Sequence, residues 1–502
     1  MFPYLTVIGV VPLVAAIVVA AAPRERTGTA KWVALLASLV SFVLTLVMAA
    51  QFRADGPRFQ FVENHAWIPQ FGVRYALGVD GISLVLIGLT VVLVPVAIAG
   101  AWRERGARVD GGDKGYFALV LTLETALVGA FAALDLFMFY VLFEVMLIPM
   151  YFLIGRYGGI RRQYAAVKFL LYSLAGGLLM LAAVIALAVS ASEQGRQTFM
   201  FEALTKLHLG AGAERWMFLG FFVAFAVKAS LFPFHTWLPD AVSESRPSSA
   251  ILLVGAMDPA GAYGMIRYCL QLFPNAAHFF TPVVLVLAVI GVLYGALAAI
   301  GQKDVQRLLA YTSVSHFGLI VLGIFAMTSQ AQVGATFYMV SAGLSMGALF
   351  LLAGVMTARR GSRLIDDFGG VYRVAPVLGG TFLVACLSGL ALPGLATFTS
   401  EFLVLLGTFS RYPVAAGIAT TGIILAAVYM LWMYQRTMTG PRTPAAERMR
   451  DLGRRERWAV APLILLLIVL GVFPKPVLDA IAPAVKQTMT QLHVQDVNAE
   501  GK

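Results

Sequence analysis

The sequence AFAVKASLFPFHTWLPDA, residues 224–241, decides how the rest of the chain is interpreted. It sets Lys228 inside an otherwise apolar segment and then interrupts that segment with Pro233 and Pro239. A lysine at membrane depth costs at least about 2.5 kcal/mol on insertion scales and usually marks an ion or proton pathway. Proline removes a backbone N–H, and such a break is stable in a membrane only where protein or a water-filled cavity surrounds it. The segment therefore predicts a broken transmembrane helix with a functional lysine; a lysine that snorkels to the interface is the alternative.

The composition indicates a polytopic membrane protein. Of 502 residues, 60% are hydrophobic and 13% are charged, which leaves too little polar surface for a soluble protein. Residues 1–22 lack a basic n-region and are interpreted as a first spanning helix rather than a signal peptide. Cys269 and Cys386 lie in separate apolar runs, so we expect neither an Fe–S cluster nor a zinc site within this chain.

Apolar stretches of about 18 to 25 residues predict about fourteen transmembrane helices. They lie at residues 3–22, 32–51, 79–101, 115–133, 135–154, 164–190, 215–234, 247–270, 279–300, 305–326, 331–357, 374–394, 413–435 and 458–473. Alternate loops hold 24 of the 37 Lys and Arg residues, and the loops and termini on the opposite side hold 11. Because cytoplasmic loops are enriched in Lys and Arg, this bias predicts a plasma (inner) membrane protein with both termini on the non-cytoplasmic side. The net charge of +11 is thereby explained without nucleic acid.

A second interrupted segment, SGLALPGLATFTSEFL, lies at residues 388–403. Pro393 and Gly394 form its break, and Glu401 is its charged residue. Paired interrupted helices in matching halves indicate an inverted-repeat transporter; a coincidental Pro-Gly in one long helix is the alternative. We therefore predict an all-α membrane fold with two inverted five-helix repeats, in which helices 7 and 12 are broken. The predicted units are residues 1–114 (helices 1–3), 115–272 (first repeat, helices 4–8), 273–437 (second repeat, helices 9–13) and 438–502 (basic loop, helix 14 and C-terminal tail).

Titratable residues occur about once per predicted helix within the apolar segments. They are Glu124, Glu144, Lys168, Lys228, Asp258, His316 and Glu401, together with His235 in the first break. Burial favours the neutral form of such groups, and a nearby opposite charge restores the charged form. A Glu144–Lys228 pair would then hold or release a proton when one charge moves. The set predicts a buried proton pathway; charge pairs that only specify packing are the alternative.

The sequence predicts no metal site and no nucleotide-binding site. No two of the six histidines share an i, i+4 helix face, and no phosphate-binding glycine loop, nucleotide fingerprint or catalytic triad is present in the sequence. His235 and His316 suit a proton pathway because imidazole titrates near neutrality; a satisfied core histidine is the alternative for His316. Asp80, Asp135 and the pair Asp366/Asp367 lie at predicted helix ends and are interpreted as helix caps or interfacial residues.

Six segments, spread over nearly the whole chain, resemble a known family. They are LGVDGISL (77–84), FEVMLIPMYFLIGRYG (143–158), KASLFPFHTWLPDA (228–241), QKDVQRLLAYTSVSHFG (302–318), DFGGVYRVAP (367–376) and LPGLATFTSEFLVLLGTF (392–409). Together they resemble the antiporter-like subunits of proton-pumping NADH:quinone oxidoreductase, respiratory complex I. The phrase LIPMYFLIG and the fourteen-helix length favour the subunit M branch. The resemblance implies a proton-translocating membrane-arm subunit that is driven by quinone reduction elsewhere and has no redox centre of its own.

The resemblance also implies residue roles and partners. Glu144 corresponds to the family's carboxylate that pairs with the broken-helix lysine, Lys228, and Lys168 to the lysine of the preceding helix. His316 corresponds to the central histidine, and Glu401 to the terminal proton-exchanging glutamate. NADH, FMN, Fe–S clusters and quinone are implied only in partner subunits. The implied partners are the other membrane-arm subunits, sister antiporter-like subunits included, within the lipid bilayer.

Two positions depart from the family pattern. Pro259, preceded by Asp258, stands where the family usually has a lysine, and Ala342 stands where it usually has a histidine. Water or Asp258 would then have to carry protons between the halves, or this copy conducts poorly. Three functions stay open: a complex I proton-translocating subunit, a subunit of an Mrp-type cation/proton antiporter, and a paralogue that lost pumping and serves as an assembly scaffold.

Overall fold

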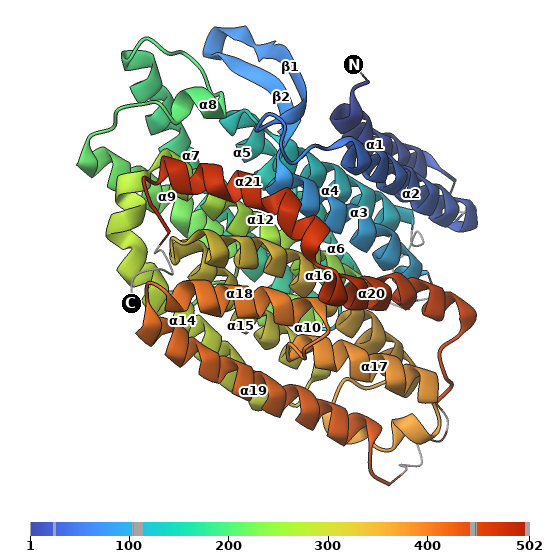
Figure 1. Ribbon diagram of the computed structural model, residues 1–502. Coiled ribbons are helices and arrows are strands. Elements are labelled where there is room, and N and C mark those ends of the chain that lie inside the picture. Colours follow the sequence, from blue (N-terminus) through green and yellow to red (C-terminus); the bar gives the residue numbers. More distant parts are fainter. Residues whose placement is uncertain are drawn as a thin grey trace.

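Long apolar helices, packed side by side, make up most of the chain (Figure 1). The structure, a computed structural model, describes residues 2–23, 27–102, 104, 114–441, 447 and 449–496. Within these ranges, eleven helical stretches are long and apolar enough to cross a membrane, or twelve if α20 (Arg454–Val472) and α21 (Lys475–Gln491), bent by 72°, form one span. The predicted all-α polytopic class is confirmed, while the count of fourteen stays a prediction. Eight of the basic residues behind the loop-charge prediction lie outside the described residues: Arg24, Arg26, Arg103, Arg105, Arg108, Arg442, Arg448 and Lys502.

The N-terminal part adds a β-hairpin that the sequence analysis did not predict. This part contains three helices, α1 (Tyr4–Ala21), α2 (Thr27–Gln51) and α3 (Gly81–Ala101). The hairpin lies between α2 and α3 and consists of the antiparallel strands β1 (Gln60–Ile68) and β2 (Val73–Val79). Figure 1 shows this hairpin projecting beyond the helix ends. Gly72, with φ at 71°, supplies the left-handed residue of the turn. The stretch is too short and too polar to span a membrane, so a search for apolar runs passes over it.

The middle of the chain forms the first group of helices. In order they are α4 (Lys114–Ala132), α5 (Leu136–Val145), α6 (Leu147–Tyr157), α7 (Arg162–Glu193), the short α8 (Phe201–Leu204), α9 (Ala211–Lys228) and α10 (Trp237–Glu244). A continuous helical run then extends from Pro247 to Leu272. It consists of α11 (Pro247–Leu252), α12 (Asp258–Gly264) and α13 (Leu270–Leu272), separated by two π-helical turns, η3 (Leu253–Met257) and η4 (Met265–Cys269).

The second group of helices completes the bundle. It comprises α14 (Pro274–Ile300), α15 (Val305–Phe325), α16 (Ser329–Arg360), α17 (Pro376–Gly389), α18 (Ala396–Phe409) and α19 (Pro413–Met438), with the 3₁₀ turns η5 (Ile365–Asp367) and η6 (Val371–Arg373) between α16 and α17. Beyond α20, the region predicted as a tail contains α21. Its buried residues Ile481, Val485 and Met489 recur every fourth position, the spacing of one face of an amphipathic helix.

The core lies along α15, α16 and the run from Pro247 to Leu272. Between 94% and 100% of the residues in their apolar windows are buried, compared with 28% to 33% in α1, α2 and α19. The outer helices nevertheless expose large apolar side chains, among them Ile17, Leu36 and Ile424. An exposed apolar face on a helix is stable against lipid but not against water. The bundle thus buries its centre and presents a hydrophobic perimeter.

The two predicted helix breaks are present, and both helices end in the same way. Two residues after α9 ends, Ser230 has φ at 51°, and two residues after α17 ends, Ala391 has φ at 56°. In each case the next backbone N–H bonds a carbonyl five residues earlier, Leu231 to Ala226 and Leu392 to Leu387, both at 2.9 Å. This is a Schellman-type helix end, usually built on glycine. Two non-glycine residues in the left-handed region indicate that the surrounding packing determines each break.

A side chain closes each break from its far end. Trp237 Nε1, at the start of α10, donates to the carbonyl of Val227 at 3.0 Å. Thr397 Oγ1, at the start of α18, donates to the carbonyl of Ser388 at 2.7 Å. Helix ends leave backbone carbonyls without intrahelical partners, which is costly where water is scarce. The two hydrogen bonds give a second donor to carbonyls that already accept from the backbone N–H groups of Ser230 and Ala391, and they tie the second half of each helix to the first.

Two predicted caps are confirmed. Asp80 accepts a hydrogen bond from the backbone N–H of Ser83 at the start of α3, in a reciprocal capping box. Asp135 accepts one from the backbone N–H of Met138 at the start of α5. Each carboxylate therefore satisfies an N–H that the helix itself leaves free.

Candidate functional site

Lys228 is the last residue of α9 and lies directly before the first break. Its side chain is buried, with 1% of the residue's surface exposed. The ammonium lies 4.8 Å from the centroid of the Phe143 ring and 5.9 Å from that of Phe169, within range of cation–π attraction. Within the described part of the chain, Nζ has no hydrogen-bond partner. The structure thus places a buried amine at the break without a fixed partner for its protons.

Glu144 is one of two carboxylates whose charge acts on Lys228. It lies at the end of α5, and a glycine on α7 makes room for it. A Cβ placed on Gly177 would lie 2.1 Å from Glu144 Oε1, far inside van der Waals contact. The neighbouring Gly176 has a different role, since a Cβ there would meet the Cα of Ala224 at 3.0 Å. Gly176 therefore allows α7 to approach α9, while Gly177 provides the space for the carboxylate.

Asp258 is the other carboxylate that acts electrostatically on Lys228. It is fully buried, and within the described residues neither carboxylate oxygen has a hydrogen-bond partner. Its helix, α12, packs closely on the end of α9, because a Cβ on Gly261 would lie 2.6 Å from the nitrogen of Ala229. Lys228, Glu144 and Asp258 thus form one group, in which an amine interacts with two carboxylates from different helices.

Lys168 and His235 lie on the other side of the break. Lys168, in the second turn of α7, is partly exposed, and its Nζ lies 2.7 Å from Oδ2 of Asp240 on α10. His235 is buried in the break, with its ring 4.9 Å from that of Tyr294 and 5.7 Å from that of Phe232. Neither ring nitrogen of His235 has a hydrogen-bond partner among the described residues. Lys168 therefore pairs with Asp240, which the sequence analysis did not select.

The second half of the chain brings His316 and Glu401 to the same tyrosine. The hydroxyl of Tyr338, on α16, donates a hydrogen bond to Oε1 of Glu401 on α18. The Tyr338 ring lies 5.5 Å from the ring of His316 on α15. On its other side, His316 Nε2 lies 3.3 Å from the carbonyl of Gly389, the last residue of α17. Histidine, tyrosine and glutamate thus line up beside the second break.

Tyr338 lay outside the sequence analysis because it is a neutral aromatic residue in a helix rich in apolar residues. Its spacing from other residues gives no signal. A charge-based search finds Glu401 but not its donor. Asp240 is charged and lies within the interrupted segment 224–241, but the sequence does not show that it pairs with Lys168. Pairing between distant helices decides both roles, and it becomes visible only in the fold.

The two family positions that depart from the pattern lie in the packed centre. Ala342 is buried on α16, next to Gly343. A Cβ on Gly343 would lie 2.7 Å from the carbonyl oxygen of Gly255, so α16 and the Pro247–Leu272 run cross there in close contact. Pro259 has no N–H to give to the carbonyl of Gly255, and the turn directly before α12 is π-helical. No titratable side chain replaces the lysine at position 259 or the histidine at position 342.

Glu124 stands apart from the group around Lys228. It is fully buried on α4, and neither carboxylate oxygen has a hydrogen-bond or ion-pair partner among the described residues. A buried carboxylate without a cation is expected to be protonated or to be served by water. The structure therefore does not place Glu124 with the other predicted pathway residues.

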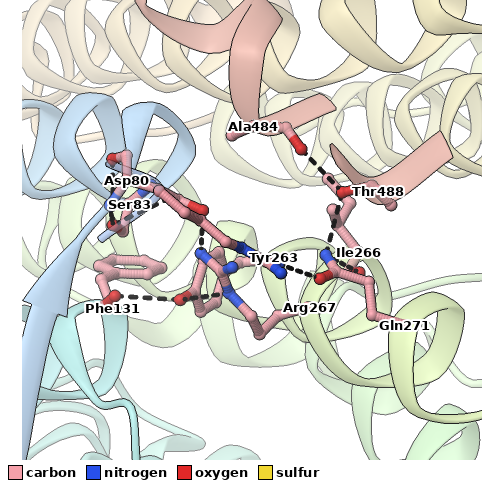
Figure 2. Close-up of polar contacts among 10 residues, drawn as sticks. Asp80, Ser83, Phe131, Tyr263, Ile266, Arg267, Gln271, Ala484 and Thr488 are labelled. Carbon is pink, nitrogen blue, oxygen red and sulfur yellow. Dashed lines mark hydrogen bonds and ion pairs between the residues drawn. The ribbon is translucent and has the colours of Figure 1, made fainter. Parts of the chain in front are cut away.

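A separate polar cluster lies where the Pro247–Leu272 run meets the start of α3 and α21. Figure 2 shows Arg267 between Asp80 and Tyr263: its guanidinium forms an ion pair with Asp80 and donates to the hydroxyl of Tyr263 at 3.2 Å. The Tyr263 hydroxyl in turn donates to the carbonyl of Phe131. Asp80 is thus both a helix cap and the counter-ion of a buried arginine. Asp80 and Tyr263 thus both engage Arg267, as in a structural cluster, while Arg267 Nη1 has no hydrogen-bond partner among the described residues.

One turn further, Gln271 connects the same helical run to α21. Its Nε2 donates to Thr488 Oγ1 at 3.0 Å, and the Thr488 hydroxyl donates to the carbonyl of Ala484 (Figure 2).

Within the described residues, no group of three or more His, Cys, Asp or Glu side chains is arranged to hold a metal ion. Cys269 and Cys386 are both buried and unpaired.

Comparisons with known proteins agree on one family. Residues 133–426 match the sequence profile of the family described as NADH:quinone oxidoreductase/Mrp antiporter, TM. The chain is 50% identical to NADH-quinone oxidoreductase subunit M of Mycobacterium tuberculosis, over 98% of this chain and 95% of that protein. It is 39% identical to subunit M of Rhodobacter capsulatus, over 97% of each chain.

Solved structures show the same similarity in three dimensions. A chain of respiratory complex I from Thermus thermophilus with bound NADH matches with a TM-score of 0.89 at 31% identity, over 97% of this chain and 99% of that one. A chain of the Mrp complex of a Dietzia species matches with a TM-score of 0.85, over 97% of each chain. At 21% identity, the second match is a similarity of fold alone.

Proposed function

Because the chain belongs to the NADH-quinone oxidoreductase subunit M family, we propose that it is a proton-translocating membrane-arm subunit of that enzyme. It works beside the other membrane subunits of complex I, and NADH oxidation and quinone reduction take place elsewhere in the assembly. One observation carries the proposal: Lys228 is a buried amine without a hydrogen-bond partner in the described residues, and the charges of Glu144 and Asp258 act on it.

In the first repeat, the proposed proton pathway passes through Lys228 and is called here the first half-channel. Its operation depends on the movement of one charge near Lys228. A negative Glu144 or Asp258 stabilises the charged lysine, and neutralising either carboxylate withdraws that stabilisation. Because Lys228 has no fixed hydrogen bonds, no such bond has to be broken when it gives up its proton. A charge that approaches or leaves the pair therefore decides whether Lys228 holds or releases a proton. Lys168, which is partly exposed, and His235, which is buried in the break, are proposed to carry protons between this group and the aqueous phase.

The second half-channel is proposed to run through His316, Tyr338 and Glu401. The Tyr338 hydroxyl donates to the Glu401 carboxylate, so it stabilises the deprotonated glutamate. When Glu401 accepts a proton, the tyrosine is free to accept a hydrogen bond from water or from the histidine side. In this way one hydroxyl connects the central histidine with the terminal carboxylate.

The topology that we propose has fourteen spans and two inverted repeats. The broken pairs α9–α10 and α17–α18 would each form one span, and α20 would form the last. Residues 115–272 and 273–437 would be the repeats, flanked by 1–114 and 438–502. The matching Schellman-type ends of α9 and α17 support this assignment. Both termini are proposed to lie outside the cytoplasm, in the plasma (inner) membrane.

Cofactors are proposed to stay with the partner subunits. NADH, FMN, Fe–S clusters and quinone have no assigned residues in this chain, and its part in the enzyme is translocation rather than electron transfer. Sister antiporter-like subunits and the lipid bilayer are the proposed neighbours, and nucleic acid is not a proposed partner.

The test measures proton uptake per NADH oxidised by the reconstituted parent complex and compares the native complex with the Lys228→Ala variant. We expect lower uptake in the variant, because the switchable amine is lost. Lys475→Ala provides the control, since this lysine is exposed at the start of α21 and should leave uptake unchanged. Equal uptake and equal turnover in Lys228→Ala would show that this chain does not pump.

Two other functions are separated by the same preparation. An Mrp-type cation/proton antiporter subunit, favoured only by the shared fold, would show sodium-dependent transport without NADH. An assembly scaffold, favoured by Pro259 and Ala342 at the family's lysine and histidine positions, would leave uptake unchanged when Lys228 or Glu401 is replaced. The 50% identity to a subunit M over nearly the full chain favours the complex I function.

A further inference from the structure

The half-helix α10 carries two carboxylates, and each lies between cations from the two halves of the chain. Asp240 Oδ2 lies 2.7 Å from Lys168 Nζ on α7, and Asp240 Oδ1 lies 2.8 Å from Arg307 Nη1 on α15. The three side chains are between 15% and 31% exposed. Charge-assisted hydrogen bonds of this length are among the stronger polar contacts of proteins. One carboxylate therefore connects both halves through its two oxygens.

Glu244, one helical turn later, repeats the arrangement more loosely. Its Oε2 accepts a hydrogen bond from the backbone N–H of Arg161, and Oε1 lies 3.8 Å from Arg161 Nε. Oε1 also lies 4.0 Å from Nη2 of Arg363, in the segment after α16. Arg363 is in turn paired with Asp304, which caps α15. Both acidic residues of α10 thus face one cation from each half of the chain.

The helices joined at Asp240 lead to the proposed proton-carrying residues. α10 is the second half of the helix that ends in Lys228, and Trp237 ties its first turn to the carbonyl of Val227. α15, which begins at Val305, carries Arg307 in its first turn and His316 in its middle. α10 packs against both α7 and α15. A displacement of α10 therefore reaches the first break and the helix of His316.

Among the described residues, the two family positions in the packed centre offer no comparable charged connection. At the two family positions there, Pro259 and Ala342 carry neither charge nor polar hydrogen. Where α16 and the Pro247–Leu272 run cross, Gly255 and Gly343 are in backbone contact. A charged link between the halves lies instead at the partly exposed end of the bundle, where Asp240 holds two cations.

We propose that Asp240 couples the two repeats of this chain. It is a positioning residue that holds α10 between Lys168 and Arg307, so that a change of charge in one half shifts the broken helix and the start of α15 together. This inference rests on the proposed proton-translocating function and states how its two halves communicate. Coupling of this kind is a difference in free energy between two arrangements, so it is measured by substituting the partners singly and together.

The experiment uses the reconstituted parent complex with Asp240→Asn, Asp240→Glu and Arg307→Gln. The asparagine keeps the shape and one acceptor but removes the charge that holds both cations. We expect proton uptake per NADH to fall in Asp240→Asn and Arg307→Gln by the same factor as in Lys228→Ala, with subunit content and quinone turnover retained. Asp240→Glu should restore most of the uptake. The double variant Asp240→Asn/Arg307→Gln should be no worse than either single variant, because each breaks the same link.

Glu456→Gln is the matched control. Glu456 forms an ion pair of 2.6 Å with Arg359, with side chains 25% and 18% exposed, and ties α20 to α16 away from α10. Its loss should leave uptake per NADH at the native value. The proposal is overturned if Asp240→Asn pumps like the native complex while Lys228→Ala does not. It is also overturned if uptake in Asp240→Asn falls only in proportion to lost subunit content. Native uptake in Lys228→Ala would instead refute the proposed function.

Discussion

Gly177→Ala tests the proposed role of Glu144 without removing any charge. A Cβ at this position would lie 2.1 Å from Glu144 Oε1 and 2.6 Å from its Cδ. A carbon and a carboxylate oxygen need about 3.3 Å, close to the separations at which dispersion contacts are optimal. The carboxylate would therefore have to move by about 1.2 Å. Since the atoms in the way belong to the flexible end of a side chain, the helix α7 can keep its place.

The expected effect on Lys228 is modest and measurable. Opposite charges that set each other's protonation lie within about 4 to 6 Å. At an effective dielectric constant of about 20, their attraction is about 3.3 kcal/mol at 5 Å and about 2.7 kcal/mol at 6.2 Å. The change of about 0.6 kcal/mol corresponds to a factor of about three in the proton equilibrium of the pair. A larger side chain, in Gly177→Val, should increase the effect.

Proton uptake per NADH in the reconstituted complex, with turnover measured on the same vesicles, is the assay. Uptake should decrease from native to Gly177→Ala to Gly177→Val. Gly417→Ala is the control, because a Cβ on this glycine of α19 meets nothing within 4 Å. If both Gly177 variants assemble and pump like the native complex, the position of the Glu144 carboxylate is irrelevant to pumping, and the switch described for Lys228 is wrong.

Two further substitutions test the other clusters. Tyr338→Phe removes the donor to Glu401. A hydrogen bond to a charged group contributes about 1.5 to 3 kcal/mol to stability, so the unfolding temperature should fall somewhat and uptake per NADH should fall in the assembled complex. Unchanged uptake would exclude the tyrosine from the pathway. Arg267→Met leaves Asp80 buried without its cation, which costs about 3 to 5 kcal/mol, so the unfolding temperature of the complex should drop. The double variant Arg267→Met/Asp80→Asn should recover part of the lost stability, because asparagine is neutral and still caps the helix. Equal losses in the single and the double variant would contradict the ion-pair explanation.

Much of the architecture follows from apolar patterning. Spans of sufficient length, the two breaks and the caps of Asp80 and Asp135 were predicted from residue type and spacing alone. The reason is that membranes impose a simple rule on the backbone, since each N–H and C=O must be bonded within a helix or at a protein-lined break. The β-hairpin and α21 lie outside the long apolar runs and are polar on one face. A search for apolar segments of membrane-spanning length therefore does not predict them.

The site was only partly predictable, for a different reason. Embedded charge identifies Lys228, Asp258 and Glu401, since a charged residue at membrane depth is expensive in any context. It does not identify their partners. Tyr338 is neutral, and Lys168 faces Asp240 rather than the group around Lys228. Pairing depends on which helices lie side by side, and this follows from the packing of the whole bundle.

The π-helical turns on either side of α12 change the direction in which the side chains that follow them point around the helix axis. Each such turn accommodates about one extra residue, so later side chains are rotated by about 100° around the axis compared with an unbroken α-helix. Along the run from Pro247 to Leu272, Gly255 touches α16, Gly261 touches the end of α9, and Arg267 reaches Asp80, and the π-helical turns between them change the angles at which these contacts point. A single helical run thus contacts three neighbours. Two chains aligned residue by residue will consequently point matching side chains in different directions wherever only one of them has such a turn.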